Sequence, residues 1–267
     1  MTPTNSEANS NTIHGLWIGS ILSLMEQLSI RSFLANGFKY CLYTYEHLEN
    51  VPAGVHIMNA NDILPKEEIF VYQHGPDAGS YAGFADQFRY KVLLEEGGWW
   101  ADLDVVCLRP FNFTNIYVLP THNAEKGGVI IASCIFRVPA GCEFIRACFE
   151  ESRRIDKNQL HWGQIGPLLM TRKMKEYHLD SFILPTSYFC PIDHWNLSQF
   201  VGGNIEAGML SQITNNSCGI HLWNEMWRRK NRGDNSSAQL AHHWQYDKNR
   251  IYPEDTLLGK LQRKYLC

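Results

Sequence analysis

The sequence predicts a single α/β domain with a mostly parallel central sheet. Residues 13–58 read in the order strand, helix, strand, strand, which is typical of parallel pairing. Nothing in the chain of 267 residues repeats, and no linker is long enough to divide it into two domains. We therefore expect a disordered polar tail over residues 1–12 and one domain over residues 13–267.

The first half of the predicted sheet comes from three short apolar runs. They cover residues 13–19, 40–45 and 55–58, and their lengths and residue types are those of buried strands. Between the first two runs, residues 21–35 carry apolar side chains near helical spacing, and Asn36-Gly37 is a typical helix end.

The middle of the chain predicts a helix that leads directly into a strand. Phe84, Phe88 and Val92 recur at i, i+4 in residues 84–96, and Gly97-Gly98 ends this helix because glycine adopts the left-handed conformation readily. Residues 99–108 are then expected to form one strand. Further along, the pattern predicts strands over 128–138 and 182–184 and helices over 142–153 and 163–177, and it assigns nothing after Ile220.

Composition excludes several classes of protein. With 45% hydrophobic residues the chain is neither disordered nor fibrous. A total of 24 Lys and Arg against 27 Asp and Glu gives a net charge of −3, which offers no electrostatic reason for tight, unspecific nucleic-acid binding. None of the eight cysteines forms a CxxC pair, so we expect reduced, buried thiols rather than a zinc site or a disulfide framework.

The start of the chain is polar and lacks the basic and apolar regions of a signal peptide. No apolar stretch reaches the roughly 18 residues that a membrane span needs. We expect a cytoplasmic protein with at most peripheral membrane contact. Four glycosylation sequons keep a secretory location as the alternative: Asn112, Asn196, Asn215 and Asn235.

Two aspartates carry the clearest chemical signal. If residues 99–108 are one strand, Asp102 and Asp104 share a face about 6.5–7 Å apart and repel each other. A hard cation such as Mg²⁺ or Mn²⁺ would relieve that repulsion. Asp86 and Arg89, at i, i+3 on the preceding helix, would border the same pocket. The alternatives are a solvated Asp-x-Asp loop and an ordinary helix salt bridge.

Residues 85–110 (ADQFRYKVLLEEGGWWADLDVVCLRP) resemble the DXD region of glycosyltransferases with the GT-A, Rossmann-like fold. The similarity is greatest to the family of α-1,4-galactosyl- and N-acetylglucosaminyltransferases and initiating mannosyltransferases, and it extends more distantly to the clostridial glucosylating toxins. Two positions differ from the family pattern: Ala85 replaces the usual Ser or Thr, and Trp100 replaces the usual Tyr. The matching residues are Asp86, Arg89, Leu93, Gly97, Gly98, Asp102 and Asp104.

Four further segments resemble the same family in the same order. The opening IHGLWIGS is similar to its first strand, whose Trp stacks on the nucleotide base. The other three are HWGQIGPLLMTR at 161–172, TSYFCPIDHW at 186–195 and GIHLWN at 219–224.

The resemblance implies a metal-dependent retaining glycosyltransferase of polysaccharide biosynthesis. It would move a hexose or N-acetylhexosamine from a nucleotide sugar, UDP-linked by preference, to a glycan or glycolipid acceptor. The implied metal is Mn²⁺ or Mg²⁺, held by Asp104, Asp102 and His221. The implied donor-binding residues are Leu16, Trp17, Asp86, Arg89, Asp102 and Trp223, with Trp223 on a closing lid, and the implied catalytic residues are Asp102, Asp104, Arg89 and Gln164.

Several alternatives stay open at this stage. Retention could use a covalent intermediate or front-face attack, and Gln164 beneath the reacting carbon could equally be a polar residue at a helix start. Asp193 is a candidate acceptor contact or a turn cap. The basic run Trp227–Lys230 with Arg232 is expected to be a solvated face, with contact to the diphosphate or to an acidic acceptor as the alternative. The pair His242-His243 is expected to have a core or surface role rather than to bind a metal. A toxin-like transferase that modifies protein side chains, and a carbohydrate-binding or hydrolytic protein, are the alternative functions.

Overall fold

The computed structural model describes residues 11–203, 211, 213, 215–231 and 246–267. Most of the predicted tail and four residues discussed above, Arg232, Asn235, His242 and His243, lie outside these ranges. Thr12, which the sequence assigned to the tail, already belongs to the first strand.

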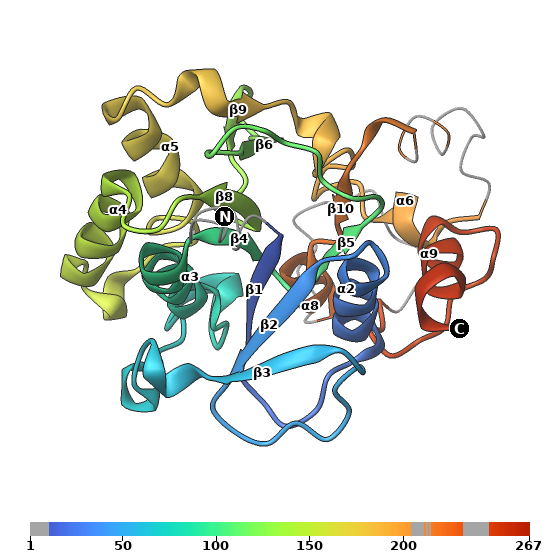
Figure 1. The fold of residues 1–267 in the computed structure, drawn as a ribbon. Helices are drawn as coiled ribbons and strands as arrows, with labels where there is room; N and C mark the ends of the chain where they lie inside the picture. Colours follow the sequence, from blue (N-terminus) through green and yellow to red (C-terminus); the bar gives the residue numbers. More distant parts are fainter. Residues whose placement is uncertain (1–10, 204–210, 212, 214, 232–245) are drawn as a thin grey trace, which may run out of the picture.

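A five-stranded sheet forms the centre of the fold (Figure 1), and it confirms the predicted α/β class. Its first four strands run parallel, and only the last is antiparallel to its neighbour. The order across the sheet is β3 (Val55–Asn59), β2 (Lys39–Thr44), β1 (Thr12–Trp17), β4 (Gly98–Ala101) and β8 (Ile135–Val138).

Helices cover both faces of this sheet, α3 (Ala82–Glu96) on one and α2 (Leu24–Ala35) on the other. Side chains alternate along β2 accordingly. Cys41 and Tyr43 belong to the apolar cluster of α3, whereas Tyr40 and Leu42 belong to that of α2. This alternation is expected of a strand that is buried on both faces.

The ends of both helices are fixed by local chemistry. Ser23 caps α2, and the Glu26 carboxylate accepts a hydrogen bond from the Ser23 backbone N–H, so the helix begins a few residues later than predicted. Gly97 ends α3 with a φ of 65°, and a Cβ at this position would lie 2.5 Å from the backbone nitrogen of Ala140. Only glycine fits there, which confirms the predicted helix end.

The prediction of one strand over residues 99–108 is wrong. The chain forms β4, then a turn at residues 102–104, then β5 (Val105–Cys107), which belongs to a different sheet and pairs antiparallel with β10 (Gly219–His221). The turn closes with a 3.1 Å hydrogen bond from the backbone N–H of Val105 to the carbonyl of Asp102. Aspartate favours such turns, so the two carboxylates do not share a strand face.

Helix α2 supplies the hydrogen bonds that the second edge of β5 lacks. Ser29 donates its hydroxyl to the carbonyl of Val105 at 2.7 Å, and the N–H of Cys107 donates to the Ser32 hydroxyl at 2.8 Å. Both serines are buried. The position of the turn before β5 is therefore tied to helix α2 as well as to the central sheet.

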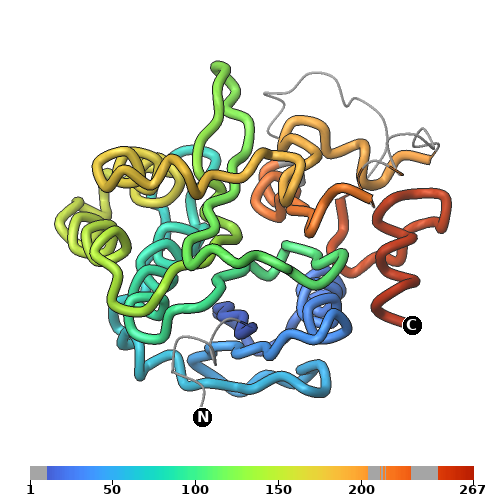
Figure 2. The backbone as a smooth tube through the Cα atoms, turned by 45° about the horizontal axis from the view of Figure 1, so that its top comes forward, coloured from blue at the N-terminus to red at the C-terminus, as the bar shows by residue number. Residues whose placement is uncertain are grey.

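The remaining elements surround this core. The predicted strand over 128–138 is two strands separated by a turn, and the helix predicted from 163 begins only at Pro167, a favoured first helical residue. A hairpin formed by β6 and β7 projects from the body (Figure 2). The elements around the core are β6 (Leu119–Asn123), β7 (Val129–Ile131), α4 (Glu143–Arg154), α5 (Pro167–Glu176), β9 (Ile183–Leu184), α6 (Ser198–Val201), α8 (Asn224–Asn231) and α9 (Leu257–Leu266).

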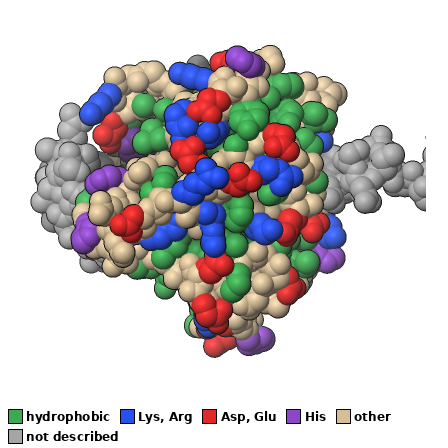
Figure 3. Space-filling view, turned by 90° about the vertical axis from the view of Figure 1, so that its left-hand side faces the viewer, with side chains coloured by type: hydrophobic (Ala, Val, Ile, Leu, Met, Phe, Trp, Pro, Cys, Tyr) green, Lys and Arg blue, Asp and Glu red, His purple; other side chains and the backbone are tan. Residues whose placement is uncertain are grey.

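On the face that carries α4 and α5, positive and negative side chains intermingle (Figure 3). Arg172 pairs with both Glu151 and Glu176 there, and Lys173 pairs with the same two carboxylates. Because the two signs of charge alternate, this face does not present a positive patch that would attract a polyanion. In the part of the chain that the structure describes, no helix is long and apolar enough to cross a membrane.

Candidate active site

Asp104 lies at the end of the turn between β4 and β5, where two elements of the C-terminal half reach it. Its Oδ2 atom accepts a 2.8 Å hydrogen bond from the backbone N–H of Asn224, the first residue of α8. The same oxygen lies 3.1 Å from Nε2 of His221. Burial alone would raise the pKa of Asp104, but the His221 charge and these hydrogen bonds hold it below its usual value.

His221 reaches Asp104 because β10 pairs with β5. The register places His221 opposite Val105, directly after the turn, and the N–H of Leu222 donates to the carbonyl of Asp104 at 2.8 Å. Burial acts to lower the pKa of His221, but the Asp104 carboxylate raises it well above its usual value. His221 and Asp104 therefore form a buried ion pair.

Asp102, at the start of the turn, is held by the preceding strand and helix. Its Oδ1 atom accepts 2.7 Å and 3.0 Å hydrogen bonds from the indole N–H of Trp100 and from Arg89 Nη2. Burial and the Asp104 charge raise the pKa of Asp102 despite the nearby Arg89. With its side chain 28% exposed, Asp102 is the more accessible of the two aspartates.

Arg89 lies between two carboxylates, as the i, i+3 spacing on helix α3 predicted. Its guanidinium is 3.2 Å from Asp86 and 3.0 Å from Asp102, and it also donates to the carbonyl of Ser133. Burial raises the pKa of Asp86 to about 7, although Arg89 acts in the opposite direction. Arg89, itself held by Asp86, thus fixes the orientation of the Asp102 carboxylate.

The three predicted metal ligands lie together. Potential ligand atoms of Asp102, Asp104 and His221 are all within 4.8 Å of one another, closer than the spacing expected for one strand face. Two carboxylates and an imidazole are a donor set that suits Mn²⁺, with carboxylate oxygens also suiting Mg²⁺. The residues present therefore fit the expected cation.

Trp17 and Leu16 lie at the carboxyl end of β1, beside the end of β4. Because these strands are parallel, their carboxyl ends meet at one edge of the sheet, where α/β folds bind ligands. The Leu16 side chain is buried in the core. Trp17 is half-buried, and its indole N–H has no acceptor among the described residues.

Trp223 packs on the metal-ligand set. Its ring centre is 4.0 Å from that of His221, and its indole N–H donates to the carbonyl of Ile192 at 2.8 Å. The residue has a φ of 60°, a left-handed conformation that is costly for a bulky side chain. These contacts hold Trp223 in place at the site, and its proposed role in a lid stays a prediction.

Gln164 and Asp193 form hydrogen bonds with residues other than Asp102 and Asp104. Gln164 uses its side-chain carbonyl to accept from the N–H of His161 at 3.1 Å, and it lines a hollow with α4 and α5. Asp193 accepts a 2.9 Å hydrogen bond from Asn123 on the projecting hairpin. The catalytic role of Gln164 and the acceptor role of Asp193 therefore stay predictions.

The basic run on α8 is not a solvated face. Trp227 is buried, and Arg228 pairs with Glu225 and donates to the carbonyls of Pro76 and Ala78. Arg229 pairs with Asp77 and lies over the ring of Trp162. The described arginines of this run therefore tie helix α8 to the loop before α3.

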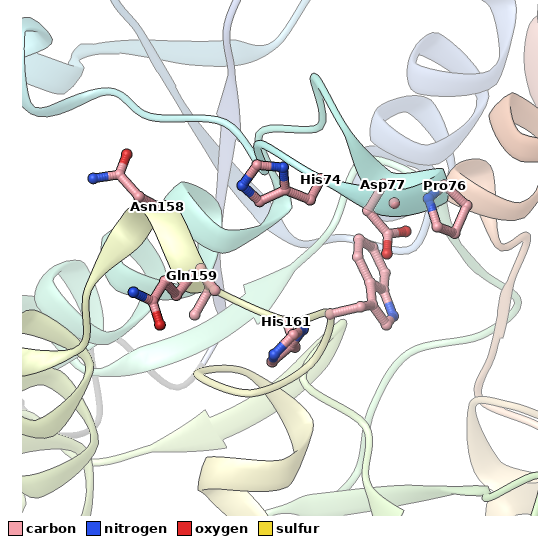
Figure 4. Close-up of a pocket in the computed structure, with 9 residues that line it drawn as sticks. His74, Pro76, Asp77, Asn158, Gln159 and His161 are labelled. Atoms are coloured by element: carbon pink, nitrogen blue, oxygen red, sulfur yellow. The ribbon is translucent and has the colours of Figure 1, made fainter.

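A cavity of about 470 Å³ lies next to the contacts of Arg229, since Asp77 and Trp162 both line it. Two segments, 74–77 and 158–162, face each other across it (Figure 4). Its polar lining includes His74, Asp77, Asn158, Gln159 and His161.

Two contributors to the site were missed by the sequence analysis. Lys248 places its ammonium 5.3 Å from the centre of the Trp17 ring, and its charge helps to lower the pKa of Asp104. The Asn224 backbone N–H is the other. Neither has a local signal, because Lys248 follows an unassigned stretch and a backbone donor has no side-chain signature.

Two models of known families match the chain. The α-1,4-glycosyltransferase conserved region matches residues 139–247, and the glycosyltransferase sugar-binding region containing the DXD motif matches residues 20–121. No curated protein matches the sequence. The solved structure of PaToxG glycosyltransferase is 16% identical, with a TM-score of 0.48, and the alignment covers 66% of this chain and 75% of that one.

Proposed function

This chain is a glycosyltransferase with a DXD sugar-binding region, and we propose that it transfers a hexose or N-acetylhexosamine from a UDP-sugar to a glycan or glycolipid, with retention of configuration. The observation that carries this proposal is the meeting of Asp102, Asp104 and His221 beside the buried Asp86–Arg89 pair. That arrangement combines a cation site with groups that can bind sugar hydroxyls.

The proposed cation is Mn²⁺ or Mg²⁺, held by Asp104, Asp102 and His221. When bound, it would neutralise the charge that develops on the departing nucleoside diphosphate. Lys248 lies close enough to Asp104 to influence its pKa, and its ammonium is paired with the buried carboxylate of Glu26. Its ammonium also lies over one face of the Trp17 ring.

Trp17 is proposed to stack on the nucleotide base. A half-buried indole at the carboxyl edge of the sheet offers an aromatic surface on which a base can stack. Leu16 would contribute its backbone, since its side chain is in the core.

Arg89 and Asp102 are proposed to orient the donor sugar. Asp102 uses one oxygen for Arg89 and Trp100, and its second oxygen is not needed for those two hydrogen bonds. A carboxylate held so firmly can accept from a sugar hydroxyl without losing side-chain freedom on binding. Asp86 holds Arg89 from the other side.

A saccharide acceptor is favoured over a protein side chain. The conserved region of the α-1,4-glycosyltransferases matches residues 139–247, which form the half of the chain that follows the central sheet. Asp193 and Trp223 both lie in this part of the chain, and the Trp223 ring packs on His221.

The proposal is tested by thermal unfolding of the full chain with a panel of nucleotide sugars, each measured with Mn²⁺ and with EDTA. A rise in melting temperature with one UDP-sugar and Mn²⁺ that EDTA abolishes supports it. A carbohydrate-binding or hydrolytic protein would respond to free saccharides and not to nucleotides, and that result would overturn the proposal.

A further inference from the structure

The two ring nitrogens of His221 have different surroundings. Nε2 lies against Asp104, whereas Nδ1 is buried, and besides Asp104 the imidazole interacts with the thiol of Cys134. Close to this imidazole are the thiols of Cys134 and Cys190. Potential ligand atoms of the three residues are all within 4.8 Å of one another.

Backbone hydrogen bonds hold the three residues in place. Asp102 donates its N–H to the carbonyl of Cys134 at 2.7 Å, which ties the turn before β8 to the DXD turn. The N–H of His221 donates to the carbonyl of Phe189 at 3.0 Å, which ties β10 to the residue before Cys190. A site whose ligands are fixed this way loses little freedom when it binds an ion.

We propose that Cys134, Cys190 and His221 form a binding site for a thiophilic divalent cation of the Zn²⁺ class. Two sulfurs and an imidazole nitrogen at close range are ligands that Zn²⁺ prefers, and three protein ligands leave a fourth position open. Binding releases the two thiol protons to solvent. The resulting pair of thiolate charges balances the ion, so the complex adds no net charge to a buried position.

This site differs in chemistry from the one that contains Asp102 and Asp104. Carboxylates favour hard cations such as Mg²⁺ and Mn²⁺, while thiolates favour Zn²⁺. The two sites share His221, and a neutral imidazole has only one lone pair for a metal. A cation on Nδ1 leaves the proton on Nε2, where it donates to Asp104. When Zn²⁺ is bound, His221 should therefore no longer be available as a ligand for Mn²⁺.

The test uses Co²⁺ as a spectroscopic substitute for Zn²⁺ on the full chain, carrying Cys267→Ser to remove the exposed thiol. We expect one Co²⁺ per chain with thiolate-to-cobalt charge-transfer absorption, which stoichiometric Zn²⁺ abolishes and excess Mg²⁺ leaves unchanged. A spectrum without this absorption overturns the proposal, whatever the variants do.

Cys190→Ser separates this site from other thiols. A folded Cys190→Ser variant should lose the absorption, and its Zn²⁺ dissociation constant should rise at least about 100-fold, the upper end of what outer-shell changes cost. Cys148→Ser, in another buried cysteine that lies outside the cluster, should behave as the parent. Retained absorption in Cys190→Ser would overturn the assignment.

Asp102→Asn makes the failure of this inference distinguishable from failure of the proposed function. It removes a proposed Mn²⁺ ligand and leaves both thiols, so the Co²⁺–thiolate absorption should persist while Mn²⁺ binding weakens. Loss of the absorption in folded Asp102→Asn would contradict a separate thiophilic site and would leave the proposed function untouched.

Discussion

Asp104 and His221 are 117 positions apart in the sequence, and their side chains lie 3.1 Å apart in the fold. The pairing of β5 with β10 brings them together, and the first N–H of α8 adds a further hydrogen bond to the same carboxylate oxygen. One short antiparallel pair of strands thus joins the DXD turn to the C-terminal half of the molecule.

Replacing Asp104 with Asn should reduce Mn²⁺-supported transfer at least tenfold, roughly the lower end of the effect of changing a metal's outer partners. The amide keeps the shape of the side chain but loses the charge that a divalent cation requires. The measurement is initial rate against Mn²⁺ concentration. Asp180→Asn is the matched control, because its carboxylate is exposed and lies outside the metal-ligand set, and it should leave the Mn²⁺ requirement unchanged. Equal effects of the two changes would contradict the assignment of Asp104.

His221→Asn should raise the Mn²⁺ concentration needed for half-maximal activity, because the cation loses its nitrogen ligand. The exposed His47, which serves as the matched control, should tolerate the same change. A Mn²⁺ titration of each variant, monitored by donor binding, checks this expectation. An unchanged titration for His221→Asn would remove this histidine from the proposed hard-metal site.

Trp17→Ala should weaken donor binding by about 1–3 kcal/mol, the range for stacking of a base on an aromatic side chain. Isothermal titration calorimetry with UDP and Mn²⁺ measures the loss, and circular dichroism confirms that the variant is folded. Trp195→Ala, which removes an indole that is 37% exposed, should leave UDP affinity unaltered. Normal UDP binding by folded Trp17→Ala would exclude the stacking role.

The stability of the protein relative to Asp86→Asn should fall as the pH rises from about 4 to 7. The buried carboxyl of Asp86 has its pKa raised to about 7, while the unfolded chain releases this proton near 3.8. The native state therefore binds more protons within that window, and stability decreases with pH by at most about 1.4 kcal/mol per unit. Urea unfolding of both proteins across the range measures the difference. A difference that rises with pH would mean that Arg89 outweighs burial.

Local patterns were sufficient to predict much of the fold. The alternation of apolar residues and the glycine pair at 97–98 predicted β1, β2, α2 and α3, because burial and helix termination leave clear traces in neighbouring residues. The i, i+3 contact of Asp86 with Arg89 was predictable for the same reason. The break after β4 was not, since residues 99–108 are almost continuously apolar except for the two aspartates.

The assembly of the site depended on contacts that sequence spacing does not encode. His221 was reached through the family resemblance, and the structure places it beside Asp104. Lys248 and the pair Cys134 and Cys190 come from segments whose positions are set by tertiary packing. The basic run on α8 was misread because ion pairs with Asp77 and Glu225 form only after the loop before α3 packs on this helix.

The division of the predicted strand into β4 and β5 has a mechanical consequence. Asp102 is attached to the end of one sheet and Asp104 to the start of another, so the distance between their carboxylates changes whenever the two sheets rotate against each other. A cation held by both aspartates would act as a cross-link between the two sheets. Ser29 and Ser32 anchor β5 to α2. Substitutions at either serine would therefore change the affinity for the ion, although neither side chain is a proposed ligand.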